Sequence, residues 1–190
     1  LEVLGEPYVS TVDSGNFFLH LSVLAQGLYD YVDSEPRLLK IESEIQKMLN
    51  NVDFSDLYSE KKQLFYLGAR PGDEADSEHY YDMYMSEARA TSYFAIARGD
   101  VPKVHWEKLS RPVFGYHGHI GFASWTGTGF EYFMPTLVMP SYPGSAAYES
   151  LLFAAKMQQL DCKKIEGKTI FGKSESGFFA FDNEMYYQYQ

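Results

Sequence analysis

Residues 13–31 read Asp13-Ser14-Gly15-Asn16-Phe17-Phe18-Leu19-His20-Leu21-Ser22-Val23-Leu24-Ala25-Gln26-Gly27-Leu28-Tyr29-Asp30-Tyr31. Apolar side chains recur three or four positions apart in this stretch, at Phe17, Leu21, Leu24 and Leu28. This spacing places them along one face of an α-helix. Asp13 and Ser14 offer side-chain oxygens that can cap its first turn. The stretch therefore predicts an amphipathic helix.

A second helix is expected after a short loop. Ser34 is a candidate N-cap, and Pro36 stands early in the helix, where its missing N–H does no harm. Helical spacing continues through the apolar residues Leu38, Ile41, Ile45, Met48 and Leu49. Together the two segments predict a helical hairpin.

The rest of the chain is expected to be mainly α, with small β-hairpins in the links between helices. Residues 52–70 predict a β-hairpin around the polar turn 59–62. Further helices are expected over 77–98, 104–109, 130–137 and 145–159, with Gly99 as the C-cap of the first. Residues 113–129 are expected as strand or irregular loop, and residues 168–190 as strand followed by helix. We expect one domain over 1–190, belonging to a longer chain, because the sequence begins without Met and stops inside an aromatic segment.

Composition limits the partners that the protein can have. The formal charge is −10, which opposes nucleic acid and anionic membrane surfaces. A neutral substrate is compatible with it. Aromatic residues make up 17% of the chain and can supply flat faces for ligands, although core packing explains most of them. Cys162 is the single cysteine, which excludes an internal disulfide and fits a reducing compartment. We expect a cytoplasmic location, either alone or as a domain of a membrane-anchored protein.

Several ordered segments carry a family resemblance, the densest being Tyr80-Tyr81-Asp82-Met83-Tyr84-Met85-Ser86-Glu87-Ala88-Arg89. The others are 10–16, 24–28, 53–58, 95–102, 105–106, 124–135, 174–176 and 187–189. These segments resemble the glucoamylase-like domain of cyclic β-1,2-glucan synthases and, more distantly, bacterial endo-β-1,2-glucanases. The sequence departs from the family pattern at Phe171-Gly172-Lys173, where the family has Trp-Gly-Ile, and at Phe178-Phe179, where an Asn is usual.

The resemblance implies a fold and an activity. It implies part of an (α/α)6 toroid, in which paired helices ring a cleft that holds a β-glucan oligosaccharide or polysaccharide. The first expected activity is transglycosylation, which closes linear β-1,2-glucan into rings. Hydrolysis by an endo-β-1,2-glucanase and glucan binding without catalysis remain alternatives. The rest of a larger polypeptide is the other expected partner, and no cofactor is expected.

Candidate catalytic residues are carboxylic acids, because glycosidic bond cleavage normally needs two of them. Glu87, Glu131 and Glu175 each lie in an apolar, aromatic segment, where desolvation would raise a carboxyl pKa. Plainer roles stay open: a surface ion pair on the predicted helix for Glu87, a buried structural acid for Glu131, and a solvated loop acid for Glu175.

Candidate sugar contacts are implied by the same motifs, with structural packing as the alternative for each. They are Tyr81, Asp82, Arg89, Trp125, Tyr132 and Tyr187. His117 and His119 lack a clear third ligand, so no metal site is expected.

Overall fold

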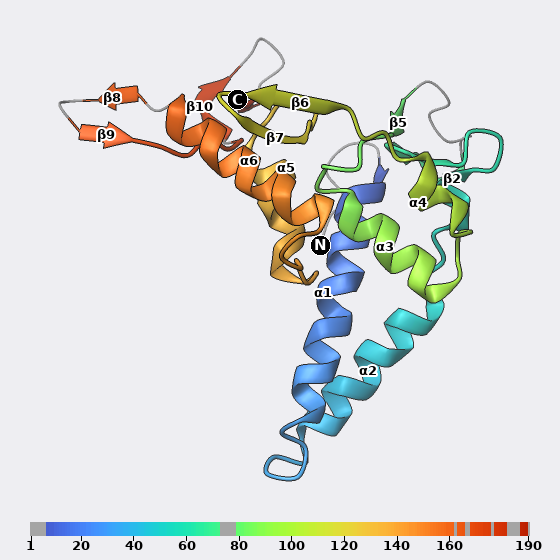
Figure 1. The fold of residues 1–190 in the computed structure, drawn as a ribbon. Coiled ribbons are helices and arrows are strands. Elements are labelled where there is room, and N and C mark those ends of the chain that lie inside the picture. Colours follow the sequence, from blue (N-terminus) through green and yellow to red (C-terminus); the bar gives the residue numbers. More distant parts are fainter. Residues whose placement is uncertain are drawn as a thin grey trace. The chain divides into compact units, whose positions relative to one another are not determined.

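The computed structural model describes residues 7–72, 79–161, 163–165, 168–175, 177–181 and 187–189, with side chains for 7–72, 79–161 and 171–175. This part of the chain is mainly α with small antiparallel sheets (Figure 1). The helices are α1 (Thr11–Tyr29), α2 (Leu38–Asn51), α3 (Arg89–Arg98), α4 (Val104–Lys108), α5 (Gly129–Phe133) and α6 (Ala146–Leu160), with 3-10 turns η1 (Ser55–Leu57) and η2 (Met134–Leu137).

The strands are short and pair in an antiparallel manner. They are β1 (Val9–Ser10), β2 (Tyr58–Ser59), β3 (Leu64–Tyr66), β4 (Gly68–Ala69), β5 (Tyr80–Tyr81), β6 (Val113–Tyr116), β7 (His119–Phe122), β8 (Lys163–Ile165), β9 (Lys168–Ile170), β10 (Gly177–Phe181) and β11 (Tyr187–Tyr189). The pairs are β1–β4, β2–β3, β3–β5, β6–β7, β8–β9 and β10–β11.

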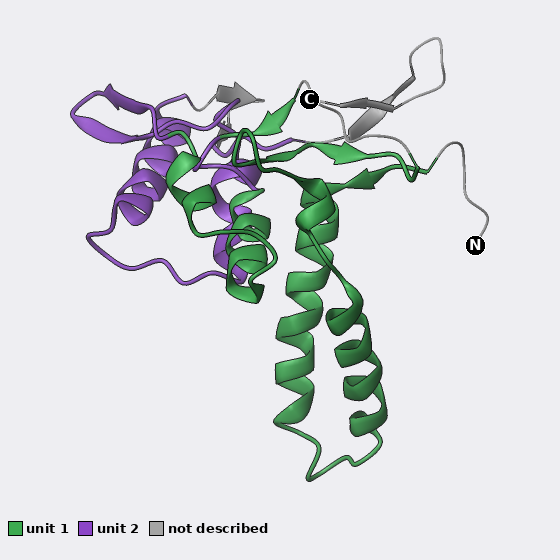
Figure 2. Ribbon diagram, turned by 90° about the vertical axis from the view of Figure 1, so that its right-hand side faces the viewer, with its two compact units in different colours: residues 1–82, 88–110 green, residues 83–87, 111–190 purple. Residues whose placement is uncertain are grey.

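The chain divides into two compact units, coloured separately in Figure 2. Unit 1 comprises residues 1–82 and 88–110, and unit 2 comprises residues 83–87 and 111–190. The second unit therefore takes a five-residue segment out of the middle of the first unit's sequence, and that segment carries Glu87.

Unit 1 contains the predicted helical hairpin, formed by α1 and α2 lying side by side (Figure 1). The start of α1 differs from the prediction, because Ser10 is the N-cap and accepts the Asp13 N–H at 3.3 Å, ahead of the expected Asp13 and Ser14. Ser34 does not cap α2 either. Its hydroxyl donates to the Tyr31 carbonyl in the loop, and α2 begins at Leu38.

A glycine allows α1 to approach α3 closely. A Cβ atom on Gly15 would lie 2.0 Å from Oγ1 of Thr91, which is fully buried on α3. Farther along α3, the Arg98 guanidinium donates to the carbonyls of Leu49 and Val52 at 2.8 and 2.6 Å. These bonds satisfy backbone oxygens at the end of α2, which have no partner within their own helix.

The predicted helix over 77–98 is wrong in the first half of its described part. Tyr80 and Tyr81 form β5, which pairs with Tyr66 and Phe65 of β3, and α3 begins only at Arg89. Glu87 consequently lies in a turn before α3 rather than within a helix. The end of the helix is as predicted, since Gly99 adopts φ 88° and its N–H bonds to the carbonyls of Ala95 and Ile96.

Unit 2 is built on α6 and the β6–β7 hairpin. A Cβ atom on Gly121 of β7 would lie 2.6 Å from the side chain of Phe153, so the glycine lets the strand lie directly on α6. The core cluster of the unit consists of Met85, Tyr132, Leu151 and Ala154.

The other predictions have mixed outcomes. The hairpin in 52–70, the helices near 104–109, 130–137 and 145–159, and a strand within 113–129 are confirmed. The helix expected at the end of the tail is wrong for the described residues there, because residues 187–189 form β11, which pairs with β10. Among the described residues, none of the helices combines the length and apolar character that crossing a membrane requires.

Candidate active site

The segment 83–87 is attached to unit 2 by its apolar side chains. Met85 is fully buried in the core cluster beside Tyr132. The Tyr84 ring packs against Phe122 in an edge-to-face arrangement, with the ring centroids 6.0 Å apart. The Arg111 guanidinium lies over the same Tyr84 ring, 4.4 Å from its centroid. Glu87 follows these anchors directly and is therefore fixed in the same unit as Glu131 and Glu175.

Glu87 is half-buried, and its pKa is raised from the usual value for a glutamate. Burial is the main cause, because it disfavours the charged form, and the negative charges of Glu131 and Glu175 add to the effect. The Ser86 hydroxyl, which donates to Oε2 at 3.1 Å, acts in the opposite direction but does not prevail. The raised pKa favours the protonated form of Glu87.

Glu131 is buried, with 4% of its surface exposed, and the loop before α5 surrounds its carboxylate. Oε1 accepts the N–H groups of Trp125 and Thr126 at 3.0 and 3.1 Å. Oε2 accepts the hydroxyls of Ser124 and Thr126 at 3.0 and 2.7 Å and the N–H of Thr128 at 3.0 Å. Burial acts to raise the pKa of Glu131, but the hydrogen bonds from Thr126, Thr128 and Ser124 together lower it below the usual value.

This loop is organised by a capping box that the sequence reading missed. The Thr128 hydroxyl accepts the Glu131 N–H at 3.5 Å, and the Glu131 side chain accepts the Thr128 N–H in return. The signal was present in the sequence, since Thr128 and Glu131 have the spacing of the Ser/Thr-x-x-Glu pattern at a helix start. The neighbouring residues Ser124 and Thr126 were also not predicted, because their role depends on the loop's path.

Glu175 reaches this loop through the docking of residues 173–175. The Gly129 N–H donates to the Lys173 carbonyl at 2.6 Å, and the Phe130 N–H donates to the Ser174 hydroxyl at 3.1 Å. These N–H groups belong to the first turn of α5, where no intrahelical acceptor exists. The segment that leads to Glu175 therefore accepts hydrogen bonds from backbone N–H groups that have no acceptor within α5.

Two further contacts position the Glu175 segment. The Gln158 side chain on α6 accepts the Lys173 N–H and donates to the Lys173 carbonyl, both at 3.0 Å. Oε1 of Glu175 lies 3.0 Å from Oγ1 of Thr128, the residue that also contacts Glu131. Two of the three predicted carboxylic acids thus meet at one hydroxyl group, and the third, Glu87, lies within their electrostatic influence.

The predicted sugar contacts in unit 2 differ in accessibility. Trp125 is 49% exposed, and its backbone N–H donates to Oε1 of Glu131. Tyr132 is 3% exposed, and its hydroxyl donates to the Phe122 carbonyl and accepts the Ser124 N–H. Tyr132 therefore supports the loop from within the core.

The remaining predicted sugar contacts are divided between the two units. Tyr81, Asp82 and Arg89 belong to unit 1, where Asp82 is exposed and Arg89 is buried at the start of α3. The side chain of Tyr187 lies outside the described side chains, although its backbone forms part of β11.

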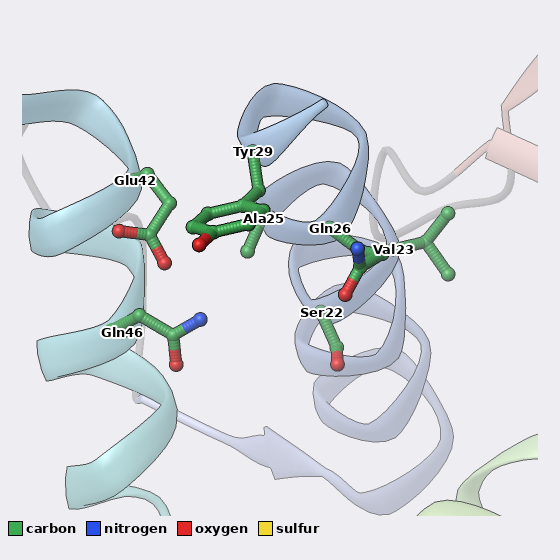
Figure 3. A pocket seen from close by; sticks show the side chains of 7 residues that line it. All are labelled: Ser22, Val23, Ala25, Gln26, Tyr29, Glu42 and Gln46. Carbon is green, nitrogen blue, oxygen red and sulfur yellow. The ribbon is translucent and has the colours of Figure 1, made fainter. Parts of the chain in front are cut away.

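Unit 1 has an open pocket of about 550 Å³ between α1 and α2, with both polar and apolar side chains in its lining (Figure 3). It is lined by Ser22, Val23, Ala25, Gln26, Tyr29, Glu42 and Gln46. None of the predicted site residues lines it. In the part of the chain with described side chains, no group of three His, Cys, Asp or Glu residues is arranged to hold a metal ion.

Sequence comparison relates the chain to a much longer protein. No family model matches it. The chain is similar to cyclic beta-(1,2)-glucan synthase NdvB of Rhizobium meliloti (strain 1021), with 36% identity over 169 residues. The match covers 87% of this chain and 6% of NdvB. The chain thus spans about 6% of the length of this curated relative, and the resemblance to cyclic β-1,2-glucan synthases is supported at the level of the sequence.

Proposed function

We propose that this chain is a carbohydrate-active segment that acts on β-1,2-glucan, with Glu87 as the proton donor and Glu175 as the second carboxylate of the reaction. The observation that carries the proposal is that one unit holds Glu87, Glu131 and Glu175, with Thr128 contacting the last two and burial raising the pKa of Glu87. A pair of carboxyl groups with different electrostatic environments is what glycosidic bond cleavage requires. The similarity to NdvB supports glucan as the substrate class.

The reaction that we favour is transglycosylation. Glu87 donates its proton to the leaving glycosidic oxygen while the bond from that oxygen to the anomeric carbon breaks. Glu175 stabilises or attacks the positively charged anomeric carbon. The part of the chain on the protonated oxygen leaves as a shorter glucan with a free hydroxyl. A hydroxyl group of the retained glucan chain then forms a new bond to the anomeric carbon, any bond from this carbon to Glu175 breaks, and the hydroxyl proton returns to Glu87. Ring closure by this route conserves the number of glycosidic bonds and consumes no co-substrate.

The third acid has a different role in this proposal. Both carboxylate oxygens of Glu131 accept N–H groups, Oε2 also accepts hydroxyl groups, and the lowered pKa favours the charged form. These properties suit the structural role that the sequence left open for Glu131, namely holding the loop 124–128. Trp125, which is 49% exposed and belongs to this loop, is the proposed aromatic contact for a sugar ring.

The proposed context is a longer polypeptide. We propose that the chain forms part of an (α/α)6 toroid, completed by helices from the rest of that polypeptide. The paired helices α1 and α2 suit such an architecture, and both carry exposed apolar side chains, including Val23, Leu24, Leu39 and Ile41. The rest of the polypeptide and a β-glucan chain are the proposed partners.

Incubation with linear β-1,2-glucan, followed by mass spectrometry of the products, tests the proposal. Cyclic products, which are lighter by one water than linear chains of the same length, support transglycosylation. Short linear oligosaccharides would show hydrolysis instead of transglycosylation, with water attacking in place of the sugar hydroxyl. Binding without any change of the glucan, measured by calorimetry, reduces the function to a glucan-binding module and contradicts the catalytic roles.

A further inference from the structure

Thr128 contacts both of the carboxylates near α5 through one hydroxyl group. Its Oγ1 lies 3.0 Å from Oε1 of Glu175 and 3.2 Å from Oε2 of Glu131. A hydroxyl carries a single proton and can donate it to one acceptor at a time. The direction of that proton decides which carboxylate Thr128 serves.

The acceptor capacity of Glu131 is already used by other groups. Its Oε2 accepts the Thr126 hydroxyl at 2.7 Å, the Ser124 hydroxyl at 3.0 Å and the Thr128 N–H at 3.0 Å. A carboxylate offers about four lone-pair sites on its two oxygens. The Thr128 hydroxyl is the most distant of the donors around Oε2 and is surplus to them.

The lone pairs of the Thr128 hydroxyl also have an assigned partner. As the N-cap of α5, Oγ1 accepts the Glu131 N–H. The Glu131 N–H thus uses a lone pair of the hydroxyl, and the Glu131 carboxylate already has its full set of donors. The remaining short contact of the hydroxyl is the one to Glu175. The hydrogen of the hydroxyl therefore points toward Oε1 of Glu175.

We propose that Thr128 is a positioning residue, whose hydroxyl donates to Glu175 and holds its carboxylate in one orientation for the reaction. This inference rests on the proposed function of Glu175. Glu131 acts one step farther away, because its N–H and its carboxylate fix the backbone and side chain of Thr128. Through the loop 124–128, the buried and charged Glu131 thereby influences the orientation of the Glu175 carboxylate.

Three variants separate this role from simple helix capping. Thr128→Val keeps the shape of the side chain and removes the hydroxyl, whereas Thr128→Ser keeps the hydroxyl. Ser145→Ala removes another N-cap of the same unit, the Ser145 hydroxyl that accepts the Tyr148 N–H on α6, without any contact to Glu175. It measures the effect that loss of a cap alone has on this unit.

Turnover of linear β-1,2-glucan is the first readout. We expect Thr128→Val to lower kcat by about 10²-fold, as a misplaced reacting group does, with a smaller effect on KM. Thr128→Ser and Ser145→Ala are expected to stay close to the unaltered protein. Equal kcat values in the Val and Ser variants would overturn the inference.

A second readout does not depend on turnover. In protein labelled with ¹³C at the glutamate carboxyl carbons, the signal of Glu175 is assigned by its loss in Glu175→Gln. We expect this signal to shift in Thr128→Val and to stay in place in Thr128→Ser and Ser145→Ala. An unchanged signal in Thr128→Val contradicts the hydrogen bond. A shifted signal in a protein without any turnover supports the hydrogen bond and rejects only the proposed function.

Discussion

The hydroxyl of Thr126 donates a 2.7 Å hydrogen bond to Oε2 of Glu131, the shortest of the bonds that enclose this buried carboxylate. The donors belong to Ser124, Trp125, Thr126 and Thr128, in the loop before α5. The carboxylate thus replaces the water that these groups would otherwise bind. A buried charge is tolerated only with such compensation. The conformation of the loop 124–128 consequently depends on the ionised state of Glu131.

Substitution of Glu131 by Gln is expected to destabilise the protein strongly. The amide has the same shape, but its NH2 group would face N–H and O–H donors, which leaves several buried groups without acceptors. We expect a loss of about 2–4 kcal/mol in the free energy of unfolding, measured by urea denaturation. Glu149→Gln, on the polar side of α6, serves as the control and should change the stability by less than about 0.5 kcal/mol.

Glu131 also gives the protein a defined sensitivity to acid. Its folded pKa is lowered, so the folded state binds fewer protons than the unfolded state. The stabilisation is complete above the unfolded pKa and is lost as the pH falls through the folded pKa. We expect the acid-induced loss of stability to be less steep in Glu131→Gln than in the unaltered protein. Parallel curves for the two proteins would show that the acid unfolding depends on other groups.

Glu87 should determine the alkaline limit of the activity. A proton donor must be protonated, and a raised pKa keeps it so to higher pH; activity is then lost as the pH rises through that pKa. The hydrogen bond from Ser86 opposes this shift. In Ser86→Ala the alkaline limb of the pH–rate profile is therefore expected at higher pH. A limb that moves to lower pH would assign the titration to a different group.

His105 is expected to make the folding of unit 1 sensitive to mild acid. The side chain is fully buried, and its ring nitrogens lie 3.0 Å from the Gln63 carbonyl and 2.8 Å from the Ser92 hydroxyl. Burial lowers its pKa, so stability falls as the pH decreases below about 6.5, the usual value of histidine, toward the folded pKa. Urea denaturation between pH 7.5 and pH 5 measures this change. It should disappear in His105→Gln, and a persistent slope in that variant contradicts the assignment.

Two glycines of α1 should respond in opposite ways to substitution by alanine. A Cβ atom on Gly15 would lie 2.0 Å from Thr91, whereas at Gly27 it would meet nothing within 4 Å. Gly15→Ala is expected to destabilise the protein by about 1–3 kcal/mol through overpacking. Gly27→Ala should stabilise it by about 0.5–1 kcal/mol, because alanine restricts the unfolded chain. Thermal unfolding of both variants measures the difference, and equal shifts would exclude the close contact between α1 and α3.

The elements that could be predicted from the sequence are those specified by local signals. Ser145 before an apolar repeat marks α6, and Gly99 marks the end of α3 because a left-handed conformation suits glycine. The segment before α3 was misassigned because its residues at helical spacing have long-range partners. Tyr81 pairs with Phe65 in a sheet, and Met85 fills the core of unit 2.

The candidate site was predictable to a similar extent. The motifs identified the acids, but the sequence alone could not distinguish their environments. The loop that saturates Glu131 depends on turns at 124–128, and the contact between Thr128 and Glu175 joins residues 47 positions apart. Such contacts follow from the folded path of the chain and have no local pattern except the capping box.

The kinetics of Glu87→Gln and Glu175→Gln on two substrates test the proposed chemistry most directly. One substrate is linear β-1,2-glucan. The other is a β-1,2-linked glucose oligosaccharide with dinitrophenol attached to its anomeric carbon, because dinitrophenolate leaves without needing a proton. We predict that Glu87→Gln loses about 10²–10⁴-fold in kcat on the glucan and retains most of its activity on the aryl glucoside. Glu175→Gln is predicted to lose activity on both, with circular dichroism unchanged. Full activity on linear glucan in either folded variant would contradict the assignment of these two carboxylates.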